Sequence, residues 1–136
     1  MKKYYLLLLI LIFSSCKINQ KSNGLRDGKW ITTDSISNNM YKYVENYNKG
    51  KEVKTWKTYK NNKIYKKEKH KKLFCEVTYF GENKKIILKG QTKIENSENE
   101  AHWFYFGEWK YYNNKGELIL LKKYENGELK SETEIQ

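Results

Sequence analysis

Few side chains in the sequence are of the kinds that catalyse reactions or bind metals. His70 and His102 are the only histidines, and there are only two aspartates. No H-x-x-x-H or C-x-x-C spacing, which metal sites use, occurs in the chain. Three glutamates between residues 98 and 108 could pair as acid and base, but the polar run 96–100 is typical of a solvated loop. We expect no catalytic residue, no metal, no cofactor and a function that is not enzymatic.

Length and composition indicate what kind of fold would have to position any site. A chain of 136 residues favours one domain. It has 27 basic and 16 acidic side chains, a net charge of +11 and no proline. These values exclude a multi-domain enzyme, a collagen-like fibre and a polytopic membrane protein. With twelve tyrosines and four tryptophans, we expect a core that is aromatic rather than aliphatic.

The first residues have the pattern of an export signal. Lys2 and Lys3 precede an apolar run over residues 4–13, and two small residues follow it. A basic head, a short apolar segment and a small-residue exit are typical of a secretory signal peptide. The run is shorter than the roughly 18 apolar residues that a membrane-spanning helix needs.

Ser14-Ser15-Cys16 at the end of this run resembles the lipobox of bacterial lipoproteins, with Phe13 where that family usually has leucine. The resemblance implies a signal peptide over residues 1–15, cleavage before Cys16, and acylation of its thiol and new amino group. Two or three acyl chains would hold the protein on the membrane, because each buried CH₂ contributes about 0.8 kcal/mol. The absence of acidic residues directly after Cys16 favours a periplasm-facing protein of the bacterial cell envelope. The alternatives are a plain signal peptide with a chance cysteine, or an uncleaved anchor.

The second cysteine, Cys75, lies in the apolar run 73–77. If Cys16 carries lipid, Cys75 has no partner for an intramolecular disulfide. We therefore expect Cys75 to be a buried structural thiol rather than a nucleophile.

The rest of the chain alternates between strand patterns and turn residues. Tyr41, Tyr43 and Tyr47 are separated by even numbers of residues, so in a strand they would lie on the same face. This pattern indicates a half-buried strand. Asn and Gly between the strand patterns tolerate the positive φ of tight hairpin turns. We predict an all-β, mostly antiparallel fold with strands at 29–33, 40–47, 51–59, 63–69, 73–80, 84–89, 101–112, 117–124 and 128–135. Residues 16–24 are predicted to be a short polar tether, and residues 25–136 a single β domain.

A tryptophan pattern repeats within this domain. Trp30 and Trp56 are 26 residues apart, and Trp109 follows 53 residues later. The segment 107–129 resembles the MORN-repeat variant family, whose hairpins carry G-x-W-x-x-Y-x-x-x-G followed by Y-x-x-G, and segments 28–50 and 50–62 match in part. The residues that carry the repeat are Gly28, Trp30, Trp56, Tyr59, Gly107, Trp109, Tyr112, Gly116, Tyr124 and Gly127.

Two architectures are compatible with these observations. Stacked hairpins would form an open meandering sheet with ladders of Trp and Tyr on one side. Alternatively, Leu25 followed by Gly28-Lys29-Trp30 and about eight strands resembles the small lipocalin-like β-barrels, which can hold one small apolar ligand. Recurrence of tryptophan by chance in an aromatic-rich protein is a third reading.

The positive charge is concentrated in one segment. Residues 42–72 contain twelve lysines and three glutamates, a balance of +9. Such a segment attracts anionic partners, although the lysines could also form an ordinary solvated face. Nucleic acid is disfavoured because Arg26 is the only arginine and because export separates the protein from it. The predicted basic patch consists of Lys54, Lys57, Lys60, Lys63, Lys66, Lys67, Lys71 and Lys72.

The sequence therefore favours an envelope lipoprotein that acts as a non-enzymatic interaction or scaffold module. Its expected partners are the lipid membrane, through Cys16, and a protein or an anionic polymer of the envelope. Some MORN-variant proteins are antitoxin or immunity components, so the resemblance suggests a toxin as partner. A lipocalin-like carrier of a small apolar ligand is the alternative.

Overall fold

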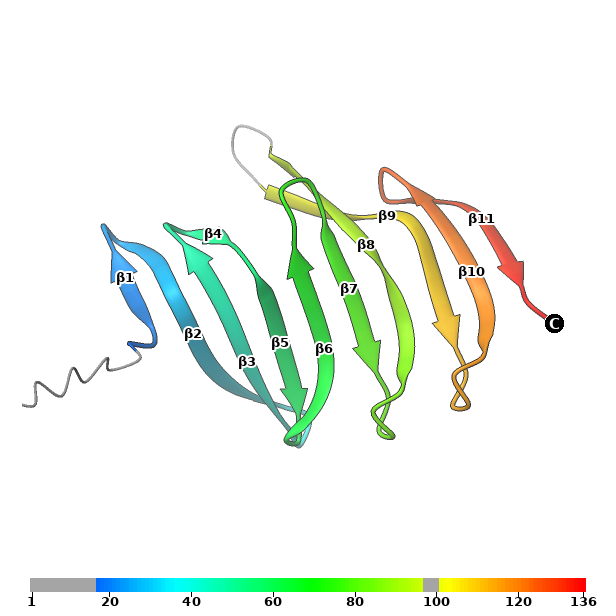
Figure 1. The fold of residues 1–136 in the computed structure, drawn as a ribbon, viewed down its shortest axis with the longest axis horizontal. Coiled ribbons are helices and arrows are strands. Elements are labelled where there is room, and N and C mark those ends of the chain that lie inside the picture. Colours follow the sequence, from blue (N-terminus) through cyan, green and yellow to red (C-terminus); the bar gives the residue numbers. More distant parts are fainter. Residues whose placement is uncertain (1–16, 97–100) are drawn as a thin grey trace, which may run out of the picture.

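A computed structural model describes residues 17–96 and 101–136, in which every regular element is a β-strand. The strands form one antiparallel sheet (Figure 1). Their bounds are β1 (Gln20–Ser22), β2 (Leu25–Ile36), β3 (Asn39–Asn48), β4 (Lys51–Glu52), β5 (Thr55–Lys60), β6 (Lys63–His70), β7 (Cys75–Phe80), β8 (Ile86–Asn96), β9 (Ala101–Tyr112), β10 (Leu118–Glu125) and β11 (Glu128–Glu134). No helix within the described ranges has the length and hydropathy that a membrane crossing requires.

The sheet is an open meander. Its order is β1-β2-β3-β5-β6-β7-β8-β9-β10-β11, with the short β4 added to β3. β1 and β11 lie at opposite ends of the sheet (Figure 1). The prediction of an open all-β sheet is confirmed. The lipocalin-like alternative is wrong, because a barrel requires pairing between the first and last strands of the sheet.

Short turns explain why consecutive strands pair with one another. Asn61 and Asn62 join β5 to β6 with φ of 49° and 64°, and Asn126 and Gly127 join β10 to β11 with φ of 49° and 83°. Two successive residues with positive φ make a hairpin turn whose twist matches that of the strands. The turns predicted from Asn and Gly at these places are therefore confirmed.

Several boundaries differ from the predicted ones. The strand predicted over 51–59 is divided into β4 and β5, because Lys54 adopts a left-handed φ of 61°. β7 begins only at Cys75, after the exposed Leu73. β8 continues to Asn96, well past the predicted end at residue 89, because its polar second half pairs with β9.

The segment predicted as a tether, residues 16–24, also differs from expectation. β1 pairs with β2, and Ile18 forms a bridge to Lys29. Ile18 and residues 20–22 are thus paired within the sheet rather than part of a free linker. The predicted signal peptide, Cys16 and most of the predicted loop 96–100 lie outside the described residues.

The core is small and aromatic. Trp109, Cys75 and Val77 are the buried hydrophobic residues of the described ranges. Tyr and Leu side chains of β7 to β10 pack around them. The indole of Trp109 lies against Gly90, where any Cβ would overlap the ring. The absence of a side chain at Gly90 therefore gives Trp109 its place on the sheet.

Removal of this ring tests the core. We expect Trp109→Ala to lower the free energy of unfolding by about 3–5 kcal/mol, the usual cost for a large buried aromatic ring. Trp103→Ala is the matched control, because its ring is 39% exposed whereas that of Trp109 is 1% exposed. Denaturant titration of both variants measures the difference. A loss below about 0.5 kcal/mol for Trp109→Ala would contradict this description of the core.

Candidate functional site on an aromatic sheet face

Three hairpins share the same tryptophan geometry: β2–β3, β5–β6 and β9–β10. In each of them the first strand carries a tryptophan. Its indole Nε1–H donates to a main-chain carbonyl oxygen on the preceding strand of the sheet: Trp30 to Gln20 at 3.1 Å, Trp56 to Asn46 at 2.9 Å and Trp109 to Gln91 at 3.1 Å. The indoles therefore tie each hairpin to the strand before it. The three tryptophans are equivalent in position as well as in sequence.

The residue two before each tryptophan has a left-handed backbone. Its φ is 72° at Gly28, 61° at Lys54 and 65° at Gly107. Because glycine adopts this conformation without steric cost, the G-x-W pattern at two of these places has a direct explanation. Lys54 shows that the backbone turns in the same way where glycine is absent.

A ring also stands at an equivalent position on the second strand of each hairpin. Trp30 is directly opposite Glu45, and Tyr47 follows two residues later. The same register places His70 beside Trp56 and Tyr124 beside Trp109. His70 therefore occupies the place that tyrosine has in the other two hairpins. The sequence prediction missed this role, because His70 lies in a lysine-rich run.

The other predicted repeat residues fall into two groups. Tyr59 and Tyr112 each stand three residues after a tryptophan, and so point to the opposite face of the sheet. Gly116 and Gly127 are turn residues with positive φ.

Rings from β2, β3, β5, β6 and β9 form a continuous row on one face of the sheet. We call this set, Trp30, Tyr47, Trp56, His70 and Trp103, the aromatic row. Successive ring centroids are 6.3, 5.0, 4.5 and 6.1 Å apart. These are distances at which aromatic pairs attract one another.

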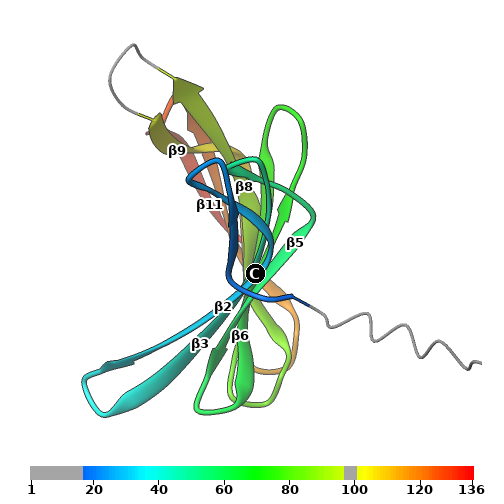
Figure 2. The same cartoon turned by 90° about the vertical axis from the view of Figure 1, so that its left-hand side faces the viewer.

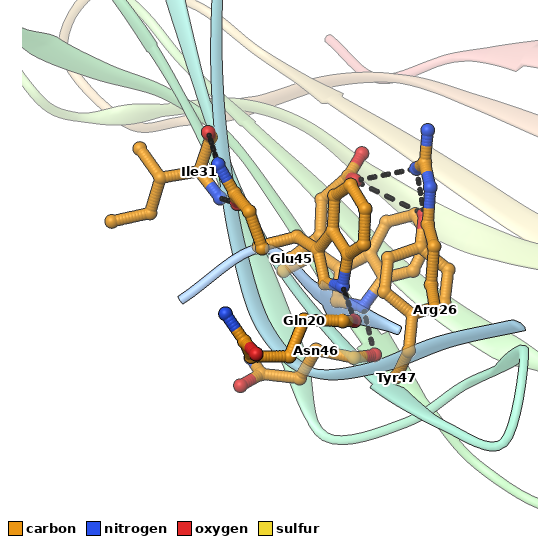
Figure 3. Close-up of polar contacts among 9 residues, drawn as sticks. Gln20, Arg26, Ile31, Glu45, Asn46 and Tyr47 are labelled. Atoms are coloured by element: carbon orange, nitrogen blue, oxygen red, sulfur yellow. Dashed lines mark hydrogen bonds and ion pairs between the residues drawn. The ribbon is translucent and has the colours of Figure 1, made fainter. Parts of the chain in front are cut away.

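Arg26 extends the aromatic row at its β2 end. Its guanidinium lies 4.7 Å from the ring centroid of Trp30 and donates to the hydroxyl of Tyr47 at 2.8 Å. It also forms an ion pair with Glu45 at 3.3 Å (Figure 3). The cation, the carboxylate and the rings hold one another in place at the surface.

The other end of the aromatic row borders a hollow of about 300 Å³. Its polar lining includes Lys66, Thr92, the imidazole of His70 and two carboxylates. The lining residues are Glu52, Trp56, Lys66, Glu68, His70, Cys75, Val77, Tyr79, Thr92, Trp103, Tyr105 and Trp109. An aromatic hollow with a few polar groups is the usual form of a binding pocket.

His70 is the unusual polar group of this hollow. Its Nε2 is buried and has no hydrogen-bond partner among the described residues. Burial lowers the pKa of His70, and Lys66 acts in the same direction, while Glu68 and Glu52 oppose the shift. The imidazole is therefore held in its neutral form. A buried nitrogen without a partner is available to a ligand or to a partner's side chain.

Cys75 forms part of the same hollow but is chemically inert. Burial and then the charge of Glu68 raise the pKa of its thiol to about 12. Since the thiolate is the reactive form of cysteine, this thiol is not a nucleophile near neutral pH. The expectation that Cys75 is a buried free thiol is confirmed.

An ion pair lies at the edge of the hollow. Lys66 forms an ion pair with Glu68 at 2.8 Å. Burial disfavours the charged form of Lys66, but the hydrogen bond and charge of Glu68 outweigh it with the help of Tyr79, so the pKa of Lys66 is raised. Lys66 therefore stays charged beside the hollow.

The eight lysines of the predicted basic patch do not form one surface. Lys63 pairs with Glu82 at 2.9 Å. The lysines lie at different ends of the β5–β6 hairpin and on different faces of the sheet. Lys60 and Lys63 flank its turn, Lys54, Lys71 and Lys72 lie at its other end, Lys57 and Lys67 are on one face and Lys66 is on the other.

No three His, Cys, Asp or Glu side chains in residues 17–96 and 101–136 come together in a group that could hold a metal ion. No family model matches the chain, and neither a curated protein nor a solved structure matches it. Its function has to be inferred from this geometry.

The environment of His70 predicts a pH dependence. Because the fold lowers the pKa of His70, the unfolded chain takes up a proton near pH 6.5 that the folded chain does not. The stabilisation from neutral His70 is therefore complete above pH 6.5 and is lost as the pH falls below it. Unfolding free energies measured between pH 7.5 and 5 should decrease less in His70→Phe than in the native chain.

His102→Gln is the matched control, because the side chain of His102 is exposed. This variant should keep the native slope of stability against pH. Equal slopes for the native chain and His70→Phe would show that His70 is not held neutral by the fold.

Proposed function

We propose that this protein is a non-enzymatic interaction module, held at the bacterial cell envelope by lipid on Cys16, that binds a partner through its aromatic face. One observation carries the proposal: the aromatic row lies on a face that no second layer of the described chain covers. Domains usually cover such a face with a second sheet or with helices. Here the rings are left for a partner.

The composition of this face supports binding of a macromolecule. Trp, Tyr and Arg are the residues that most often dominate the energy of protein interfaces. Arg26 and Trp103 mark the two ends of the row, and the hollow beside Trp103 could take one side chain of a partner. The resemblance to MORN-variant proteins suggests a toxin as the partner in an immunity-like role.

The chain between the proposed lipid and the sheet is short. Ile18, two residues after Cys16, already bridges to Lys29. Two residues span at most about 7 Å. The acylated residue would therefore keep the β1 edge of the sheet close to the membrane surface.

A carrier function in the manner of a lipocalin requires an enclosed interior. The open sheet has none, so we do not propose this function.

The anchor is tested by Cys16→Ser. In cell fractionation, the native protein should remain with the membranes, and the variant should lose its acyl mass and leave the membrane fraction, since one hydroxyl cannot replace two or three acyl chains. Cys75→Ser, which keeps Cys16, should fractionate as the native protein does. Membrane association of Cys16→Ser equal to that of the native chain would contradict the anchor.

The binding face is tested with a pair of variants in the full acylated chain. Arg26→Ser combined with Trp103→Ser removes the ring at one end of the aromatic row and the guanidinium that extends its other end. Its control combines Lys115→Ser with Ile119→Ser. It removes one cation from the turn between β9 and β10 and one exposed apolar side chain from β10. Envelope proteins captured by the native chain are purified, and their affinity for each variant is measured.

We expect the row variant to bind at least about tenfold more weakly, which corresponds to about 1.4 kcal/mol, and the control to bind within about twofold of the native chain. Equal binding by both variants, or no capture by the native chain, would contradict the proposed function.

A further inference from the structure

A second surface lies on the face opposite the aromatic row. On β5 and β6, Lys57 is directly opposite Lys67, and on β8 and β9, Lys89 is directly opposite Lys110. Thr78 on β7 lies between the two pairs, opposite both Lys67 and Lys89. These five residues form a single line across five neighbouring strands, which we call the lysine row.

Sequence neighbours confirm which face the lysine row occupies. Lys57 follows Trp56, and Lys110 follows Trp109, both of which line the hollow. Because successive side chains of a strand point to opposite faces, the lysine row is on the far side of the sheet from the hollow. Binding at the lysine row is therefore independent of the proposed function of the aromatic face.

The lysine row is electrostatically unfavourable in the free protein. Like charges directly opposite one another on neighbouring strands destabilise a sheet. Among the described residues, no carboxylate lies within 4 Å of the ammonium groups of Lys57, Lys67 and Lys89, and Lys110 has only Glu108 at 3.5 Å. On the aromatic face, by contrast, Lys66 and Lys122 each have a carboxylate partner within 3.0 Å.

Aromatic rings position two of these ammonium groups without neutralising them. The Nζ of Lys67 lies 5.2 Å from the ring centroid of Phe80, and the Nζ of Lys89 lies 5.4 Å from that of Tyr112. Cation–π contacts of this kind hold a lysine side chain against the sheet. The positive charge remains exposed to a ligand.

The surface along the lysine row is hollowed. One depression of about 410 Å³ includes Lys57, Lys67 and Lys69, and one of about 480 Å³ includes Lys89 and Lys110. Glu76 and Thr78 of β7 line both, so the two depressions lie side by side and together make a shallow trough across the strands. Four interstrand spacings give this trough a length of about 19 Å.

We propose that the lysine row binds an extended polymer of phosphate groups that runs across the strands. Lysine is a compact point charge that suits phosphate without a demanding geometry. The lysine row crosses the strands as one line, and the sheet is strongly twisted (Figure 2), so the surface on either side of that line turns away from a plane. A linear chain can lie along the line, whereas a flat lipid surface does not match the twisted surface around it.

The test uses the full chain and long-chain inorganic polyphosphate as the probe. The row variant carries Lys57→Gln, Lys67→Gln, Lys89→Gln and Lys110→Gln. The matched control carries Lys60→Gln, Lys63→Gln, Lys71→Gln and Lys72→Gln, which removes the same charge from the two ends of the β5–β6 hairpin. Binding is measured at low and high salt, with vesicles of phosphatidylglycerol as a separate arm.

We expect the row variant to bind polyphosphate at least tenfold more weakly and the control to bind less than threefold more weakly. Native binding should weaken at high salt, because the ammonium groups are exposed to screening. Polyphosphate should raise the melting temperature of the native chain and of the control but not of the row variant.

Equal losses in both variants would overturn the proposal, because net charge alone would then account for binding. Row-dependent binding to the vesicles without binding to polyphosphate would overturn it in favour of a lipid surface. If the row variant does not fold, Lys67→Gln with Lys110→Gln removes one lysine from each pair, and at least a threefold loss is expected. An unchanged affinity of that double variant would contradict the proposal.

Discussion

In residues 17–96 and 101–136 no second layer covers the sheet, so the sheet has to shield its own faces from water, and its stability depends on how aromatic rings do so. Most domains bury one face of a sheet against helices or another sheet. Here only Trp109, Cys75 and Val77 are buried among the apolar residues that the structure describes. Large rings that lie across the strands replace the missing layer, because each covers far more surface than an aliphatic side chain.

The indole N–H bonds make this arrangement specific. In three hairpins a left-handed residue turns the strand, the tryptophan two residues later reaches back over the preceding strand, and its Nε1–H finds a main-chain carbonyl. A buried polar group with a partner costs little, whereas one without a partner is expensive. The hydrogen bond therefore fixes the position of each indole, and the neighbouring rings pack against it. Trp109 is buried, but Trp30 and Trp56 are only half-buried and Trp103 is exposed, which is why one face can be both the main source of stability and a binding surface.

The fold could be predicted from local sequence patterns, but the pairing register of the strands could not. Asn61-Asn62 and Asn126-Gly127 indicated hairpins, and hairpins between consecutive strands already define an open meander. The break at Lys54 was missed because lysine rarely adopts positive φ. The position of His70 was missed because it follows from the pairing of β5 with β6 rather than from composition.

The positions of the lysines also depend on strand register. A segment rich in lysine predicted one basic patch, but alternation along each strand sends neighbouring lysines to opposite faces, and hairpin ends separate others. The row that the sheet does form includes Lys89 and Lys110, which lie outside that segment and join it only through β7. Register between distant strands cannot be read from spacing alone.

The role of the indoles as ties between hairpins is tested most directly by hydrogen exchange at the four indole N–H groups, followed by NMR in the native chain. If the account is right, the indole protons of Trp30, Trp56 and Trp109 exchange much more slowly than free indole, with Trp109 the slowest, and that of the 39% exposed Trp103 exchanges fastest. Similar, rapid exchange at all four sites would contradict it.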